Sequence, residues 1–303
     1  MNQIFLDKLK TIVAEDKILI DEPMKKHTTF RVGGPADYFI MPSGNEEVKQ
    51  VIDLCKESGI LYYVIGNGSN LLVSDKGYRG AIIQMYRGFA DVTVDGKEIT
   101  ASAGASLAKI ANVALDNELA GFEFAAGIPG TLGGACVMNA GAYGGEMKDV
   151  LKSVTVINQE GEIITISKEN LELGYRTSII AKKGYVVLEA VIELHDGKKE
   201  EIKAIMDDLK ERRTTKQPLD YPSAGSTFKR PEGYFAGKLI QDTGLRGFRV
   251  GDAQVSEKHC GFVINVREAT AEDINSLITQ VVEKVHAKFG VTLEPEVKKL
   301  GEF

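Results

Sequence analysis

The segment 66–73, Gly-Asn-Gly-Ser-Asn-Leu-Leu-Val, contains residue types that suit the binding of a diphosphate. It directly follows the apolar run 60–65, which predicts a buried strand. Two glycines let the backbone turn tightly and approach a ligand, and Ser69 and Asn70 add short side-chain donors beside consecutive backbone N–H groups. Neither a Rossmann nor a Walker loop fits, because Leu71 stands where the third glycine is needed and no Gly-Lys-Ser/Thr follows. We therefore expect a diphosphate-bearing ligand at this turn, bound by another fold.

A second glycine-dense stretch, 127–134 (Gly-Ile-Pro-Gly-Thr-Leu-Gly-Gly), is followed by Asn139-Ala-Gly-Ala-Tyr143. Its glycines are too frequent for a helix core, although a tight turn with close helix packing would fit this stretch taken alone. Two such segments in one chain favour a long ligand, such as a dinucleotide, that lies between two domains with backbone near it at several points.

Basic residues flank a serine-containing loop, with Arg212, Arg213 and Lys216 before it and Lys229 and Arg230 after it. Such a cluster is usually a solvated basic face. The alternative is a site for an anionic small molecule, and the residues alone leave both interpretations open.

Hydrophobic periodicity and turn residues predict the elements that position these motifs. The first part has expected helices at 6–13 and 43–58 and strands at 36–41, 61–65 and 81–85. The middle part has expected hairpins at 92–103 and 154–167, helices at 107–119 and 200–213, and a strand at 185–194. The last part has an expected strand at 262–266 and a long helix at 271–289. We predict an α+β protein with domains at 1–86, 87–214 and 215–303.

Composition places the chain among globular proteins. Of its 303 residues 43% are hydrophobic and 26% are charged, and the formal net charge of −6 argues against a general binder of nucleic acid or membrane surfaces. Three widely spaced cysteines favour a reducing cytoplasm over a disulfide framework, and the four histidines show no spacing typical of metal ligands. We expect no secretory signal, no membrane insertion and no metal, and the cytoplasm is the default location.

Six motifs carry a resemblance to a known family. Three of them resemble the FAD-binding fold of the vanillyl-alcohol oxidase type: Thr28–Gly34, Gly66–Val73 and Gly127–Gly134. Three more are similar to the UDP-N-acetylenolpyruvoylglucosamine reductase (MurB) family: Gly174-Tyr-Arg-Thr-Ser178, Ala224-Gly-Ser-Thr-Phe-Lys229 and Leu293-Glu-Pro-Glu-Val297. The resemblance runs from about Asp21 to Leu300 in the family's order.

The resemblance implies two α+β FAD-binding subdomains and a C-terminal α+β substrate-binding domain whose last residues return to the active site. It also implies that NADPH reduces a noncovalent FAD, which then reduces the enolpyruvyl ether of a UDP-sugar to a lactyl ether in peptidoglycan precursor synthesis. The implied catalytic residues are Ser226 as proton donor, Arg176 as the partner of the developing enolate, and Glu296 as polarising group or proton supply. Taken alone, these three would be a turn serine, a surface arginine and a solvated tail carboxylate.

The remaining expected site residues lie in or near these motifs. The expected cofactor-binding residues are Gly66, Asn67, Gly68, Ser69, Asn70, Leu71, Gly127, Ile128, Pro129, Gly130, Thr131, Gly133, Gly134 and Asn139. The expected substrate-binding residues are Tyr175, Lys216, Arg230 and Arg213, with Lys298 as a further anion contact.

The chain departs from the wider families in two respects. The stretch between Ser226 and Glu296 is too short for the insertion of the family's longer class, so the chain resembles the short class. Covalent flavin is not expected, because no histidine lies near the first glycine-rich turn. Because the sequence has no Rossmann loop for NADPH, we expect NADPH to share the cleft of the UDP-sugar in a ping-pong cycle.

Two alternative functions stay open: a flavin oxidase of the same fold and a nonenzymatic sugar-nucleotide-binding protein. We expect the protein to be a monomer.

Overall fold

Residues 2–303 are described here from a computed structural model of the chain. Their contacts group them into two compact units, each of which is described by itself. The first unit comprises residues up to 19 together with 39–67 and 81–213, and the second comprises 20–38, 68–80 and 214–303. The predicted division into three domains stays a prediction.

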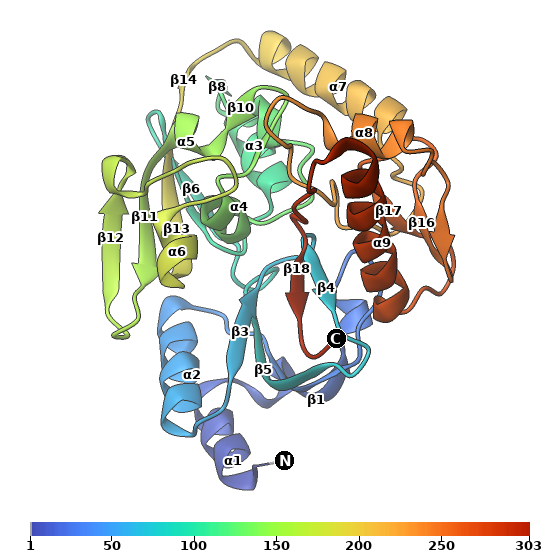
Figure 1. Cartoon of the computed structure of the whole chain (residues 1–303). Coiled ribbons are helices and arrows are strands. Elements are labelled where there is room, and N and C mark those ends of the chain that lie inside the picture. The colour runs from blue at the N-terminus through green and yellow to red at the C-terminus, as the bar shows by residue number, and fades with distance from the viewer. Residues whose placement is uncertain (1) are drawn as a thin grey trace. The chain divides into compact units, whose positions relative to one another are not determined.

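The first unit contains a five-stranded antiparallel sheet with the order β12-β11-β13-β7-β6. Val154 and Val156 on β11 are buried and alternate with more exposed residues, which is the pattern of a strand with one covered face. Helix α4 packs against β13 and β7, and α3 also contacts β7 (Figure 1). The strands of this sheet are β6 (Val92–Asp95), β7 (Glu98–Ser102), β11 (Leu151–Ile157), β12 (Ile163–Ser167) and β13 (Val186–Glu193).

The strand before the first glycine-rich turn, β3 (Tyr62–Ile65), pairs in parallel with β5 (Tyr78–Gln84). These two belong to a sheet with the order β1-β2-β5-β3, whose other members are β1 (Ile18–Pro23) and β2 (Pro35–Ile40). The short pairs of the first unit are β8 (Leu119–Ala120) with β14 (His195–Asp196), and β9 (Gly141–Ala142) with β10 (Gly145–Glu146). The helices up to residue 216 are α1 (Gln3–Ile12), α2 (Asn45–Glu57), α3 (Leu107–Asp116), α4 (Leu132–Met138), α5 (Met147–Val150), α6 (Ile179–Lys183) and α7 (Lys199–Lys216).

The second unit is built around the long helix α9 (Ala271–Phe289), which packs on the antiparallel sheet β15-β16-β17 (Figure 1). Thr270 and Asp273 form a capping box at its start, and Gly290 ends it in the left-handed conformation. Asp75 adds a carboxylate that accepts from the N–H groups of Ala271 (2.9 Å) and Glu272 (3.0 Å), where a negative charge stabilises a helix. The other elements are α8 (Ala236–Asp242), β4 (Leu71–Val73), β15 (Arg249–Val250), β16 (Ala253–Val255), β17 (Val263–Asn265) and β18 (Lys298–Leu300).

Most predicted elements are confirmed, and one expectation is wrong. Helix α9 has the predicted bounds, and both predicted hairpins form, as β6–β7 and β11–β12. The glycines of 127–134 were expected to exclude a helix, yet Leu132–Met138 is helical and includes Gly133 and Gly134. A Cβ on Gly133 would lie 2.9 Å from the Cβ of Ala103, so this glycine is required by close packing of the helix. Among the residues that the structure describes, no helix is both long and apolar enough to span a bilayer.

Candidate active site

The two glycine-rich segments of the sequence contact each other within the first unit. A Cβ on Gly66 would clash with the hydroxyl of Thr131, and the side-chain amide of Asn67 donates to the carbonyl of Pro129 at 3.0 Å. The amide of Gln84 on β5 donates to the carbonyl of Gly66 at 3.2 Å. The first turn is therefore fixed directly against the second segment, as expected for two parts of one ligand site.

The second segment is in turn fixed to the strand end after β7. The N–H groups of Leu132 and Gly133 donate to the carbonyls of Ala105 (2.9 Å) and Ala103 (2.8 Å). Gly127 and Pro129 are exposed, whereas Thr131 and Gly133 are buried. The first half of the segment thus presents backbone to the surroundings, and the second half anchors it.

Arg213 lies beside this segment, within the first unit. A Cβ on Gly127 would lie 2.9 Å from its Nε, and its side chain also hydrogen-bonds with Tyr143. Burial lowers the pKa of its guanidinium, and its Nε is buried without a partner among residues 2–303. An anionic or carbonyl oxygen at this position would satisfy the buried donor, so Arg213 fits a role beside the predicted cofactor loop.

The remaining part of the first turn lies in the second unit, against the Thr28–Gly34 motif. A Cβ on Gly68 would clash with the carbonyl of His27, and the N–H of Thr29 donates to the carbonyl of Gly68 at 3.2 Å. The hydroxyl of Thr29 is buried and has no partner in the part of the chain that the structure describes. Leu71 continues into β4 with a buried side chain, so only its backbone is available to a ligand.

Arg176 occupies the tip of a tight turn in the first unit. Gly174 and Thr177 exchange two backbone hydrogen bonds, of 3.1 Å and 3.3 Å, on either side of Tyr175 and Arg176. Arg176 has a φ of 56°, which is unfavourable for a residue with a Cβ, and its guanidinium lies 5.1 Å from the ring centroid of Tyr175. Tyr175 is half exposed, which suits its predicted contact with substrate.

Ser226 and Glu296 are brought together within the second unit. The N–H of Glu296 donates to the carbonyl of Thr227 at 2.8 Å, and the N–H of Lys229 donates to the carbonyl of Glu294 at 2.8 Å. Ser226 is exposed, and Gly225 before it has a φ of 73°, a conformation that glycine adopts readily. The predicted proton donor and carboxylate therefore stand on two adjacent chain segments.

The backbone of Glu296 is also held by the end of the first glycine-rich turn. The side-chain amide of Asn70 donates to the carbonyl of Glu296 at 3.3 Å, and the N–H of Lys298 donates to the carbonyl of Asn70 at 3.0 Å. From there β18 pairs in parallel with β4, directly beside it in Figure 1. The segment that carries Glu296 is therefore ordered and fixed on both sides.

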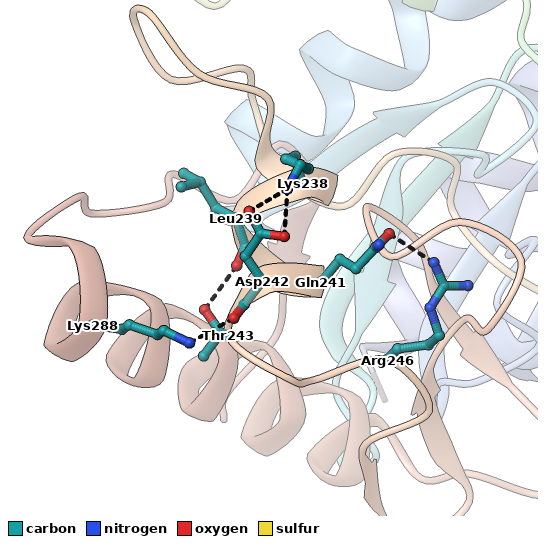
Figure 2. Close-up of polar contacts among 7 residues, drawn as sticks. All are labelled: Lys238, Leu239, Gln241, Asp242, Thr243, Arg246 and Lys288. Carbon is teal, nitrogen blue, oxygen red and sulfur yellow. Dashed lines mark hydrogen bonds and ion pairs between the residues drawn. The ribbon is translucent and has the colours of Figure 1, made fainter.

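Helix α8 supports the Ser226 loop from within the second unit. A Cβ on Gly237 would lie 3.1 Å from the N–H nitrogen of Gly261, whose carbonyl accepts from the N–H of Thr227 at 2.9 Å. Figure 2 shows how the end of α8 is fixed: Lys288 donates to the carbonyl of Asp242 at 2.6 Å, and Arg246 donates to the side chain of Gln241 at 2.7 Å.

Two of the predicted substrate-binding cations lie in the second unit. Arg230 is exposed, its guanidinium stacks 4.0 Å from the ring centroid of Phe235, and its Nε donates to the carbonyl of Tyr234 at 3.3 Å. Lys216 is exposed at the end of α7. Both cations are accessible to a diphosphate, and their roles stay predictions.

Three residues near these motifs were not predicted as site residues. Thr29 and Tyr143 lie inside motifs that the sequence did single out, and their buried or hydrogen-bonding side chains are evident only in three dimensions. Glu146 could have been noticed only through its spacing to Asp149, with which it forms a capping box.

Fold and site together define a class of protein. Within the first unit, the close approach of two glycine-rich segments and the buried Nε of Arg213, which has no partner among residues 2–303, fit a ligand that bears phosphates and hydrogen-bond acceptors. Residues 36–167 match the model of an FAD binding domain, and residues 217–300 match that of the C-terminal domain of UDP-N-acetylenolpyruvoylglucosamine reductase. The chain is thus a flavin-dependent oxidoreductase with FAD as its cofactor.

Similarity to known proteins identifies the family. The chain is 56% identical to UDP-N-acetylenolpyruvoylglucosamine reductase of Clostridioides difficile (strain 630), covering 99% of both chains, and 54% identical to that of Alkaliphilus metalliredigens (strain QYMF), covering 96% of both. Its structure is similar to the crystal structure of the Thermus caldophilus enzyme (MurB), with a TM-score of 0.79 and 36% identity over 94% of this chain and 98% of that one. Alkyldihydroxyacetonephosphate synthase shares the fold, with a TM-score of 0.51 and 17% identity over 65% of this chain and 41% of that one. The chain belongs to the UDP-N-acetylenolpyruvoylglucosamine reductase family.

Proposed function

We propose that this chain reduces the enolpyruvyl ether of UDP-N-acetylenolpyruvoylglucosamine to the lactyl ether of UDP-N-acetylmuramate, with NADPH as hydride donor. Relatives that share more than half of its residues over nearly its full length support the substrate assignment. The observation that supports the proposal is the pairing of segments 227–229 and 294–296, so that the loop of Ser226 and the segment of Glu296 are adjacent. An oxidase acting on a small alcohol would not need this pair.

The chemistry explains why these groups suit the reaction. FAD, when bound, supplies the hydride that it has received from NADPH. Addition of a hydride to the terminal carbon leaves negative charge on the neighbouring carbon and its carboxylate, which must then be protonated. Ser226 is the proposed donor of that proton, and Glu296 supports it from the adjacent segment. Arg176 is the proposed partner of the enolate, because its guanidinium stays charged and fits a carboxylate bidentately.

The proposed binding groups for the UDP-sugar are Tyr175, Lys216 and Arg230. Both cations are exposed, so a diphosphate can reach them, and each can donate charge-assisted hydrogen bonds to its oxygens. Arg213 differs, because it is half-buried against Gly127, and we assign it to the cofactor side of the site. NADPH is proposed to use the place that the UDP-sugar later occupies, in a ping-pong cycle.

An anaerobic visible spectrum tests the function directly. The purified protein, supplemented with FAD, is expected to lose its flavin absorption on addition of NADPH and to regain it with UDP-N-acetylenolpyruvoylglucosamine. Bleaching without recovery, followed by rapid reoxidation and peroxide release in air, would support a flavin oxidase instead. Absence of a flavin band with retained UDP-sugar binding would support a nonenzymatic binding protein.

The proposal extends to location and assembly. UDP-sugars and NADPH are cytoplasmic metabolites, so the reaction is placed in the cytoplasm. We propose a monomer, and light scattering of the holoprotein at micromolar concentration measures its mass. A dimer mass would overturn the monomer while leaving the reaction intact.

A further inference from the structure

Asn139, which was predicted to bind the cofactor, has a side chain that is fully used inside the protein. Asn139 is the C-terminal cap of α4, has a φ of 46° and is fully buried, with 0% exposure. Its Nδ2 donates to the carbonyl of Gly174 at 3.0 Å and to the carboxylate of Glu146 at 3.0 Å. Its Oδ1 accepts from the N–H of Lys148 at 2.8 Å. Both amide hydrogens thus have partners, and so does the oxygen.

Through Gly174, the side chain of Asn139 contacts the turn that contains Arg176. Gly174 is the first residue of that four-residue turn, and its carbonyl accepts both from Asn139 and from the N–H of Thr177. The left-handed backbone of Arg176 is unfavourable for a side chain with a Cβ, and such conformations persist only where the surroundings impose them. The bond from Asn139 is a support of this kind, supplied from 35 positions away in the sequence.

Electrostatic interactions of Glu146 also link Asn139 to Arg176. The carboxylate of Glu146 accepts from Asn139 and forms an ion pair with Lys148 at 2.8 Å. The hydrogen bond from Lys148 is the main cause that lowers the pKa of Glu146, and the positive charge of Arg176 contributes too. Glu146 is therefore ionised at neutral pH, with its field acting on the guanidinium.

We propose that Asn139, supported by Glu146, is a positioning residue that holds the Tyr175–Arg176 turn so that the Arg176 guanidinium faces the substrate enolate. The inference rests on the proposed function for the role of Arg176, and on geometry alone for the link between Asn139 and the turn. It assigns the side chain of Asn139 to the protein scaffold of the site instead of to the cofactor.

The test uses Asn139→Gly, because glycine keeps the left-handed backbone and removes only the side-chain bonds. Stopped-flow measurement of the FAD-loaded enzyme separates flavin reduction by NADPH from reoxidation by the UDP-sugar. Reoxidation is expected to slow about 10- to 100-fold, the usual effect of displacing a catalytic group by a fraction of an ångström, and flavin reduction is expected to slow much less. Asn158→Gly is the matched control, since Asn158 also makes side-chain bonds in a turn of the first unit, to Glu162.

A double-mutant cycle distinguishes positioning from general damage. If Asn139 acts through Arg176, adding Asn139→Gly to Arg176→Ala slows reoxidation no further. A second readout needs no activity: trypsin cleavage after Arg176, followed by mass spectrometry, is expected to rise about 10-fold in Asn139→Gly and to stay unchanged in Asn158→Gly, as a turn that has lost a hydrogen bond opens more often.

The outcomes separate the inference from the function on which it rests. If the parent enzyme is not reoxidised by the UDP-sugar, the proposed function fails, and the trypsin result still decides whether Asn139 holds the turn. If the parent enzyme cycles while Asn139→Gly slows both half-reactions equally, or acts additively with Arg176→Ala, the positioning role is wrong. If Asn139→Gly does not fold, Glu146→Gln is measured in its place. Loss of the negative charge is expected to slow reoxidation about 3-fold or more. An unchanged rate would overturn the role of Glu146.

Discussion

Ser226, the proposed proton donor, is an unusual choice for this role, because a free hydroxyl is a very weak acid and must be assisted by its neighbours. Its exposed hydroxyl and the paired segment of Glu296 provide that setting. We expect Ser226→Ala to leave flavin reduction by NADPH within about 2-fold of normal and to slow reoxidation by the UDP-sugar at least about 100-fold, the range of one general acid. Stopped-flow rates of the two half-reactions measure this.

Ser276→Ala serves as the control for this substitution. Ser276 lies on α9, and its hydroxyl donates to Glu272 at 2.9 Å, away from the Ser226 loop in the sequence and without any assigned part in the reaction. Equal slowing of both half-reactions in Ser226→Ala would contradict the role of proton donor.

His259 makes the second unit sensitive to acid. Burial lowers the pKa of its imidazole, and its Nδ1 accepts from the N–H of Gly261 at 3.1 Å. The unfolded chain, with an ordinary pKa of about 6.5, binds the proton more tightly, so stability is full above that pH and falls as the pH decreases toward the folded-state pKa. Thermal unfolding is expected to show a drop in Tm below about pH 6.5 that is smaller in His259→Gln.

The matched substitution for this pH prediction is His286→Gln on α9, where the imidazole contacts the hydroxyl of Thr292 at 3.1 Å. Its Tm profile shows the effect of replacing a histidine elsewhere in the second unit. Parallel Tm profiles for the parent and His259→Gln would show that His259 is not the group responsible.

At the scale of elements, β18 fixes the position of Glu296. Its pairing with β4 follows directly after the bonds between Asn70 and residues 296–298. We expect deletion of residues 298–303 to slow reoxidation about 10-fold or more, because the carboxylate loses its fixed position, while bound FAD is retained. Deletion of residues 301–303 keeps β18 and should have a much smaller effect. Retained reoxidation in the longer deletion would show that the hydrogen bonds of the Glu296 backbone to the Thr227 carbonyl and from the Asn70 amide suffice.

Some elements could be predicted from the sequence because their signals are local. The bounds of α9 follow from a capping box, a regular apolar face and a final glycine. Strands β4 and β18 were not predicted, since each has three residues and their partners lie 227 positions apart. Helix α4 was missed for a different reason: its glycines are required by packing on Ala103, and local helix propensity does not reveal such a contact.

The same distinction applies to the site. The sequence identified the segments that carry chemistry, because glycine-rich turns and motif residues are visible in a linear order. It could not show which side chains are already occupied. The side-chain amide of Asn139, a predicted cofactor ligand, is saturated by Gly174, Glu146 and Lys148. Arg213, a predicted substrate ligand, is half-buried against Gly127. The binding roles of both residues stay predictions.

At the scale of the whole molecule, the predicted cofactor-binding segments are far apart in the sequence, with Gly66 and Gly134 separated by 68 positions. A ligand that binds only the folded arrangement of such distant segments stabilises the fold by mass action. At an FAD concentration of about 100 times its Kd, the gain is about 2.7 kcal/mol, which corresponds to an increase in Tm of roughly 5 °C for a chain of this size.

Gly66→Ala tests whether this stabilisation acts through the contact of the two glycine-rich segments. The new Cβ would clash with the hydroxyl of Thr131, so we expect the variant to lose most of the Tm increase given by FAD. Gly88→Ala is the matched control, because a Cβ there has no heavy atom within 4 Å. Adding Thr131→Ala to Gly66→Ala should restore part of the shift by removing the clashing hydroxyl. A full FAD-dependent shift in Gly66→Ala itself would mean that the close approach of Gly66 and Thr131 is not needed to bind the cofactor.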